Sequence, residues 1–200
     1  MSLGSAKEKL IDELKGIGSV YKDLDHIYVQ KSLNAQEVKL ILKWLPPIYD
    51  EHLGSGHIMA RSLISATEPY DPSILIDLFE NSSFNRTIKW GIAYVLSESK
   101  TKDISDWIID QLLNKEVSFE RAGLISGIEK KVGFDETQIN EFYKRIFDRY
   151  PMAILEYFKK KGTVADIDFL LDKFYIADKN IKKEIERVIK HIQKKKKTKK

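Results

Sequence analysis

The sequence predicts an all-α chain that forms a right-handed α-α superhelix of about five helical hairpins. Three observations support this prediction. Helix-starting residues recur about every 32 residues, an amphipathic run follows each of them, and no segment shows the sustained apolar–polar alternation of a strand. With 42% apolar residues, the 200-residue chain can build one compact core. We expect one repeat domain over 1–193, with capping helices in 1–33 and repeats in 34–193, and a disordered lysine tail over 194–200.

The expected helix starts carry residues that can cap a helix N-terminus. Four aspartates precede amphipathic runs at spacings of 32, 32 and 31 residues: Asp71, Asp103, Asp135 and Asp166. A carboxylate at such a position accepts a hydrogen bond from a first-turn amide, which has no partner inside the helix. Asp135 also has a glutamine three residues later, and Ser5 and Asn34 have a glutamate at the same spacing, which predicts three capping boxes.

The first helix of three predicted pairs carries a related pentapeptide. The copies are "LIDLF" at 75–79, "IIDQL" at 108–112 and "LLDKF" at 170–174. Because the aspartate recurs with the repeat, we expect it to have a structural role, such as pairing with the following helix or its arginine.

The second helix of each pair carries a recurring triplet that ends in serine in the first three copies, at Ser65, Ser97 and Ser126. Five residues before these triplets begin, a large apolar residue recurs, which gives a column of large apolar groups: Ile58, Trp90 and Phe119. Small residues in the same helices allow neighbouring helices to approach closely: Gly91, Ala122 and Gly123.

These segments, together with "RTIKWGIAYVLS" and "ERAGLIS", resemble HEAT-like (armadillo-like) repeat proteins over roughly residues 34–192. The resemblance implies a binding scaffold far more often than an enzyme. It also implies that the second helices line the concave face, so we expect a partner surface at four basic residues: Arg61, Arg86, Lys89 and Arg121. The expected function is that of a non-enzymatic protein-binding scaffold or adaptor, whose partner carries an acidic patch.

Composition narrows the alternatives. The absence of cysteine excludes disulfides, thiolate zinc sites and cysteine nucleophiles. No apolar run is long enough to span a membrane and no secretory signal is present, so a cytoplasmic location is expected. Six of the 34 basic residues lie in the last seven positions, and the remaining 28 face 30 acidic residues. The positive net charge therefore belongs to the tail.

Two segments suggest other chemistry. "YDEHLGSGH" at 49–57 gathers possible metal ligands, but their spacing matches no ligand signature, and we predict no metal or cofactor. "SDWIIDQ" at 105–111 places Asp106, Trp107 and Asp110 on one helical turn, which is weakly similar to a family of HEAT-like DNA glycosylases. Nucleic-acid binding or base repair, nucleic-acid binding by the lysine tail, and dedicated inhibition of one partner in the manner of an immunity protein remain the alternatives.

Overall fold

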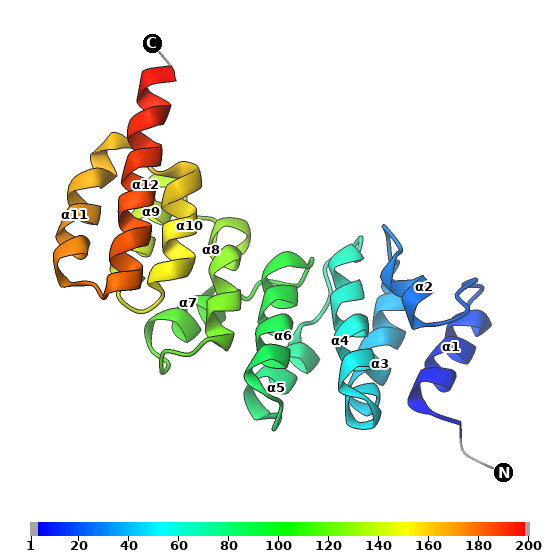
Figure 1. Ribbon diagram of the computed structural model, residues 1–200. Helices are drawn as coiled ribbons and strands as arrows, with labels where there is room; N and C mark the ends of the chain where they lie inside the picture. The colour runs from blue at the N-terminus through cyan, green and yellow to red at the C-terminus, as the bar shows by residue number, and fades with distance from the viewer. Residues whose placement is uncertain (1–3, 199–200) are drawn as a thin grey trace. The chain divides into compact units, whose positions relative to one another are not determined.

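The computed structural model describes residues 4–198, with side chains up to Lys195, and all regular elements in this range are helical (Figure 1). The α-helices are α1 (Ala6–Gly16), α2 (Leu24–Tyr28), α3 (Ala35–Glu51), α4 (Leu53–Ser62), α5 (Ser73–Asn81), α6 (Arg86–Glu98), α7 (Ser105–Leu113), α8 (Ile125–Lys131), α9 (Glu136–Ile146), α10 (Pro151–Lys161), α11 (Ile167–Ile176) and α12 (Lys179–Thr198). Three short 3-10 helices join them: Leu63–Ser65, Glu120–Leu124 and Val164–Asp166. The prediction of an all-α chain is confirmed.

The helices form two compact units, Met1–Gly133 and Phe134–Lys200, here called unit 1 and unit 2. Unit 1 contains α1 to α8, and unit 2 contains α9 to α12. A single repeat domain over 1–193 stays a prediction. Residues 194–198, expected to be disordered, continue α12 as helix, and the last two lysines lie outside the described residues. The ammonium group of Lys195 donates hydrogen bonds to the carbonyl oxygens of Lys159 and Lys160, which ties this end of α12 to α10.

In unit 1 the helices pack in consecutive pairs, α3 with α4, α5 with α6, and α7 with α8. The second members of these pairs, α4, α6 and α8, also pack against one another in chain order (Figure 1). The apolar stripes explain the pairing, because the i, i+3, i+4, i+7 positions of α3 are buried: Val38, Ile41, Leu42 and Leu45.

In two helical pairs, a backbone bridge joins the segment before the first helix to the segment after the second helix. Leu33, before α3, forms a parallel bridge with Ala66, which follows the 3-10 helix after α4. Tyr70, before α5, forms the equivalent bridge with Thr101, after α6. A recurring lysine joins successive pairs, since Lys100 donates to the carbonyl oxygen of Thr67, and Lys131, 31 residues later, donates to that of Ser99. These bonds give the sequence repeat a physical basis in the turns between pairs.

The predicted capping boxes at Ser5, Asn34 and Asp135 are all present. Asp71 and Asp103 each accept a hydrogen bond from the backbone N–H two residues later, at 3.0 and 2.9 Å. Both therefore satisfy a first-turn amide, of α5 and of α7 respectively.

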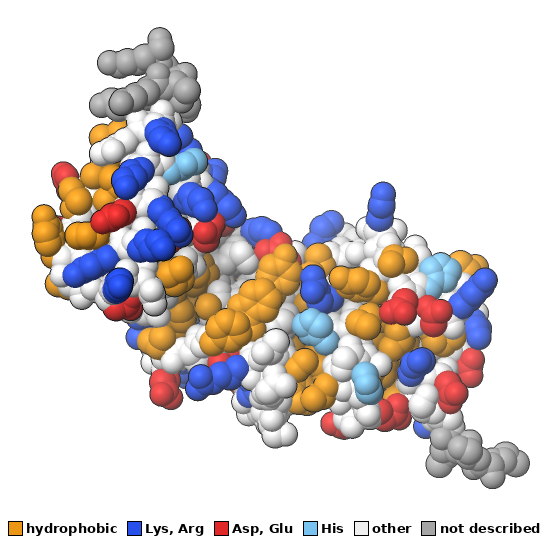
Figure 2. Space-filling model, viewed as in Figure 1, with side chains coloured by type: hydrophobic (Ala, Val, Ile, Leu, Met, Phe, Trp, Pro, Cys, Tyr) orange, Lys and Arg blue, Asp and Glu red, His pale blue; other side chains and the backbone are white. Residues whose placement is uncertain are grey.

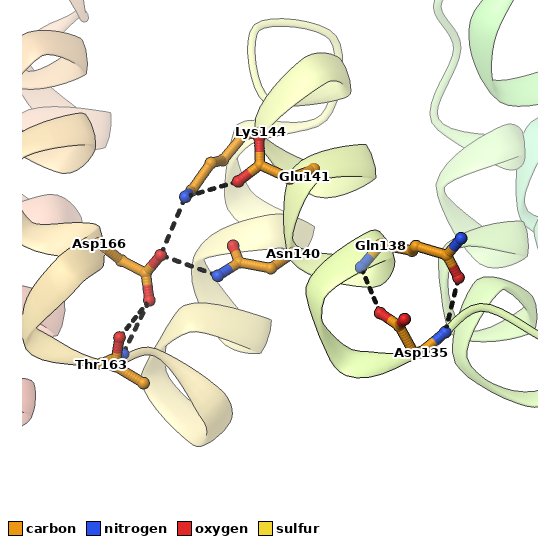
Figure 3. A network of polar contacts seen from close by, with 7 residues as sticks. All are labelled: Asp135, Gln138, Asn140, Glu141, Lys144, Thr163 and Asp166. Atoms are coloured by element: carbon orange, nitrogen blue, oxygen red, sulfur yellow. Dashed lines mark hydrogen bonds and ion pairs between the residues drawn. The ribbon is translucent and has the colours of Figure 1, made fainter.

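Asp166 differs from the prediction, because Thr163 is the cap. Thr163 and Asp166 form a capping box around the 3-10 helix that leads into α11, with Asp166 at its third helical position. The Asp166 carboxylate, which is 1% exposed, accepts hydrogen bonds from the Thr163 amide and hydroxyl, from Asn140 Nδ2 at 2.9 Å, and pairs with Lys144 Nζ at 3.2 Å (Figure 3). A buried carboxylate thus connects α9 to the start of α11 in unit 2.

Hydrogen bonding determines the charge state of this carboxylate. Burial alone would raise the pKa of Asp166, but the hydrogen bonds from Thr163, Asn140 and Lys144 outweigh it and hold the pKa below its ordinary value. The group therefore stabilises the fold above its unfolded-state pKa, and this contribution is lost as the pH falls through the folded-state pKa.

Glycine allows close packing between the second helices of unit 1. A Cβ atom added at Gly123 would lie 2.8 Å from the carbonyl oxygen of Trp90 in α6 and 3.0 Å from Ala93 Cβ. A Cβ atom added at Gly91 in α6 would lie 2.2 Å from the imidazole of His57 in α4. The expected close approach of a neighbouring helix is confirmed at Gly123, whereas at Gly91 the neighbour is the His57 side chain.

Replacing Gly123 by leucine should lower the free energy of unfolding by about 1–3 kcal/mol, because the new side chain must displace backbone atoms of α6. Gly91→Leu should cost less within the same range, since it meets an imidazole that can rotate away. Urea unfolding followed by circular dichroism measures both. Gly16→Ala has no neighbour within 4 Å of the added Cβ and should not destabilise the chain. Parent-like stability of Gly123→Leu would contradict the close approach.

Asp166→Asn should lower the free energy of unfolding at pH 7 by about 1–3 kcal/mol, because an amide NH₂ group replaces one carboxylate oxygen, and each of the two oxygens faces two donors. The deficit relative to the parent should shrink as the pH falls through the folded-state pKa of Asp166. Urea unfolding between pH 7 and pH 3 measures it, with the exposed Asp168→Asn as the control. A deficit that stays constant over this range would show that the Asp166 charge does not stabilise unit 2.

Candidate functional site

The four basic residues predicted to contact a partner all lie in unit 1. Arg61 lies on α4, Arg86 and Lys89 lie in the first turns of α6, and Arg121 lies in the 3-10 helix before α8. Lys89 and Arg121 line one pocket, and Arg86 is linked to it through Glu120, 4.0 Å from the Arg86 Nε atom. Arg61 does not line that pocket.

The pocket lies between the ends of α5 and α7 and the starts of α6 and the 3-10 helix, and its volume is about 260 Å³. Its charged lining residues are Glu80, Lys89, Lys115, Glu120 and Arg121. We call it the Arg121 pocket.

A chain of hydrogen bonds holds Arg121 in place. Its Nε atom donates to Gln111 Oε1 at 2.9 Å, and its Nη1 atom donates to the Glu116 carbonyl oxygen at 3.1 Å and to the Ser118 hydroxyl at 3.0 Å. Gln111, which is 2% exposed, extends this series of hydrogen bonds, because its Nε2 atom donates to Glu80 Oε1. All three acceptors of Arg121 are therefore neutral groups.

Trp107 also belongs to this network. Its Nε1 atom donates to Glu80 Oε1 at 2.8 Å, and its ring packs edge-on against Phe79 at a centroid distance of 5.7 Å. Asp110 accepts a hydrogen bond from Asn114 Nδ2 at 2.9 Å and pairs with Lys115 at 3.4 Å. Trp107 and Asp110 are thus engaged in structural contacts within unit 1.

Two copies of the recurring aspartate, in α5 and α7, have the predicted structural role, although with another partner, and the third copy, Asp172 in α11, is exposed. Asp77 accepts a hydrogen bond from Asn81, four residues later, as Asp110 does from Asn114. The contact lies at the end of the aspartate's own helix, and it does not involve the following helix or its arginine.

A row of aromatic rings lies on the surface of α6. Trp90 stacks on Tyr94 with a centroid distance of 5.6 Å and an interplanar angle of 9°, and on Phe119 at 6.3 Å and 23°. Arg86 precedes Trp90 by four residues, so Arg86, Trp90 and Tyr94 lie along one face of the helix. Figure 2 shows hydrophobic side chains running as a row over this part of unit 1, with basic side chains beside it. We call Trp90, Tyr94 and Phe119 the aromatic row.

Two members of the expected apolar column, Trp90 and Phe119, stack on each other at the surface. Trp90 is 36% exposed and Phe119 is 57% exposed, whereas Ile58 is half-buried. The backbone contact at Gly123 leaves no room for large rings between α6 and the 3-10 helix, so the rings stack outside it. The four-residue spacing of Arg86, Trp90 and Tyr94 in the sequence is the signal that could have predicted this face.

The surface of α4 continues the basic character of α6. The Arg61 guanidinium is exposed and lies 6.0 Å from the centre of the Tyr28 ring in α2. One turn earlier, His57 packs against Gly91 of α6, and burial, together with the Arg61 charge, lowers the pKa of this histidine. Since its pKa is lowered, His57 adds no positive charge to this surface at neutral pH.

The residues of the "YDEHLGSGH" segment make separate structural contacts. His52 caps α4, because its Nδ1 atom accepts a hydrogen bond from the Ser55 amide at 3.1 Å. Glu51 accepts a hydrogen bond from the Ala6 amide at 2.8 Å, while His57 packs against α6. Within residues 4–198, no group of three or more potential ligand side chains could hold a metal ion.

Arg121→Ala should lower the free energy of unfolding by about 1–3 kcal/mol, because buried Gln111 loses a charged donor. Arg61→Ala should change it by less than about 0.5 kcal/mol, since the Arg61 side chain is exposed. Urea unfolding of the two variants under identical conditions makes the comparison. Equal effects would show that the hydrogen-bond chain does not stabilise unit 1.

The part of the chain that the structure describes contains no helix long and apolar enough to cross a membrane. No family model matches the chain, and no curated protein or solved structure matches it either.

Proposed function

We propose that the chain is a non-enzymatic protein-binding scaffold of HEAT-like hairpins in a right-handed superhelix, and that it holds its partner on the surface of its second helices. The packing of unit 1 supports the architecture. Each second helix pairs with the helix before it, and α4, α6 and α8 pack on one another in succession, as in a stacked repeat.

The aromatic row is the observation that carries the proposed function. Exposed Trp90, on α6, and exposed Phe119, at the start of the 3-10 helix Glu120–Leu124, present two stacked rings to the surface. Tryptophan, tyrosine and arginine are the residues most enriched at the energetic centres of protein interfaces, and the aromatic rings among them bury large areas with little loss of conformational freedom. An ordered aromatic row beside basic residues is a surface on which such a partner can dock.

The charges around the row indicate the chemistry of the partner. The Arg86 side chain is 77% exposed, and its one carboxylate neighbour among the described residues is Glu120, at the 4.0 Å limit of an ion pair. Arg61 on α4 is exposed as well. An apolar segment bordered by acidic side chains complements this combination of exposed rings and exposed guanidinium groups.

The net charge of unit 1 favours a protein partner over a nucleic acid. Residues 1–133 contain 16 basic and 19 acidic side chains, a net charge of −3, whereas a phosphate backbone is normally held by a basic surface. The residues that resemble a glycosylase site are also engaged elsewhere, with Trp107 bound to Glu80 and Asp110 bound to Asn114.

Unit 2 favours the second candidate, in which nucleic acid binds the C-terminal helix. The contact between α12 and α10 places Lys195 beside the lysine-rich end of α10, residues 159–161. An attraction of this kind would weaken steeply with added salt. A dedicated inhibitor of one protein would bind its partner through the same aromatic row as a scaffold protein does. The two functions differ only in whether binding reduces the activity of the partner.

Capture from a lysate of the source organism tests the proposed function. The full chain should retain one dominant protein in the presence of nuclease, and Trp90→Ala combined with Phe119→Ala should reduce its recovery at least about tenfold, the loss expected when two interface anchors are removed. Quantitative mass spectrometry of the retained proteins measures recovery.

Tyr175→Ala is the matched control, because Tyr175 is a 75% exposed aromatic residue on α11 of unit 2. Its recovery should equal that of the parent. Recovery that depends on nucleic acid, or that survives loss of the aromatic row, would contradict the proposed function. Nuclease-sensitive recovery that also falls steeply with salt would favour the second candidate instead.

A further inference from the structure

The Arg121 guanidinium carries a charge that no carboxylate of the described chain neutralises. No described aspartate or glutamate oxygen pairs with Arg121 within 4.0 Å, and its hydrogen bonds go to an amide oxygen, a backbone carbonyl oxygen and a hydroxyl. Two other basic groups nearby do have a carboxylate neighbour. Lys115 pairs with Asp110, and Arg86 faces Glu120. A fixed, half-buried cation without a counter-ion is an unusual arrangement, because a nearby anion normally offsets the cost of desolvation.

The hydrogen-bond chain also determines which part of the guanidinium remains available. Nε and Nη1 are occupied by Gln111, Glu116 and Ser118, whereas Nη2 has no acceptor among the described residues. Because Gln111 is buried and anchored to Glu80, the guanidinium plane is held in one orientation before any ligand arrives. Preorganised donors of this kind bind an anion without losing side-chain freedom.

Lys89 supplies a second positive group to the same pocket. Its ammonium group donates to the Glu80 carbonyl oxygen at 3.4 Å, and no carboxylate pairs with it among the described residues. The two glutamates of the lining have their own positively charged or N–H neighbours. Glu80 Oε1 accepts from Trp107 and Gln111, while Glu120 Oε2 lies 4.0 Å from Arg86 Nε and is buried without a hydrogen-bond partner among the described residues. Arg121 and Lys89 are therefore the two positive groups of the lining that lack a carboxylate partner.

The net charge of the pocket selects the class of anion. Three positive and two negative side chains line it, so its formal charge is +1. A monovalent carboxylate balances this charge, whereas a phosphate dianion exceeds it and is repelled more strongly by Glu80 and Glu120 than a carboxylate is. The planar carboxylate also matches the planar guanidinium better than a tetrahedral ion does.

We propose that the Arg121 pocket binds the side-chain carboxylate of an acidic residue of the partner protein, adjacent to the aromatic row. This inference rests on the proposed function, and it names the point at which the acidic character of the partner is recognised. Lys89 precedes Trp90 and Glu120 follows Phe119, so the pocket and the aromatic row share the same two segments of unit 1. A partner segment can place its apolar side chains on the rings and its carboxylate on Arg121.

A titration of the full chain with a single carboxylate tests the proposal. The probe is N-acetylglutamate N-methylamide, and the signal is the Nε–H resonance of Arg121 in the ¹⁵N NMR spectrum, assigned by its loss in Arg121→Lys. The resonance should shift in a saturable manner at constant ionic strength. The neutral analogue N-acetylglutamine N-methylamide should cause no such shift, and phosphate should bind more weakly than the carboxylate probe.

Two variants separate a built site from general attraction to positive charge. Lys89→Gln should weaken binding of the probe about threefold, the effect of one partly exposed ion pair, and Lys22→Gln, at an exposed lysine outside the pocket, should leave the affinity unchanged. The absence of a saturable shift, an equal shift with the neutral analogue, tighter binding of phosphate, or equal effects of the two variants would each overturn the proposal. The titration needs no partner, so its failure is distinguishable from failure of lysate capture.

Discussion

The surface of unit 1 depends on the close backbone approach between α6 and the 3-10 helix at Gly123. A side chain at this position would collide with the carbonyl oxygen of Trp90, and the only side-chain atom among the three atoms nearest to it is the methyl group of Ala93. The large rings of both segments are consequently excluded from the interior, and they stack on the surface instead. One packing constraint thus places Trp90 and Phe119 side by side and makes them accessible.

The same constraint positions the polar groups beside the rings. The 3-10 helix that carries Gly123 also carries Arg121, and the contact with α6 holds it where it reaches Gln111 of α7. Gln111 in turn binds Glu80, at the end of α5. Elements from two successive helical pairs therefore meet in a single polar network. A network of this kind is most stable when all its members are satisfied, and an external carboxylate would supply the acceptor that Arg121 Nη2 lacks.

The helix starts could be predicted from the sequence because capping is local. Ser5, Asn34 and Asp135 have their partners within three residues, and spacing alone identified them. The exposure of Trp90 could not be predicted in this way, because periodicity identifies an apolar residue without showing whether its neighbours leave room for it. The partners of Arg121 lie in a different helix and in a loop, so its fixed orientation depends on tertiary packing. Whether the helical pairs form a superhelix stays a prediction, since the sequence repeat fixes the pairing of neighbours and not the twist that accumulates between them.

Site-specific photo-crosslinking in cells of the source organism is the measurement that tests the central claim most directly. A benzophenone amino acid is placed at position 119, within the aromatic row. In a second version it is placed at position 175, an exposed position on α11 of unit 2. The proposed function predicts one dominant protein crosslinked at 119 and no enrichment of it at 175. A nucleic-acid adduct at 119, or the same set of proteins at both positions, would show that the aromatic row is not a dedicated protein-binding surface.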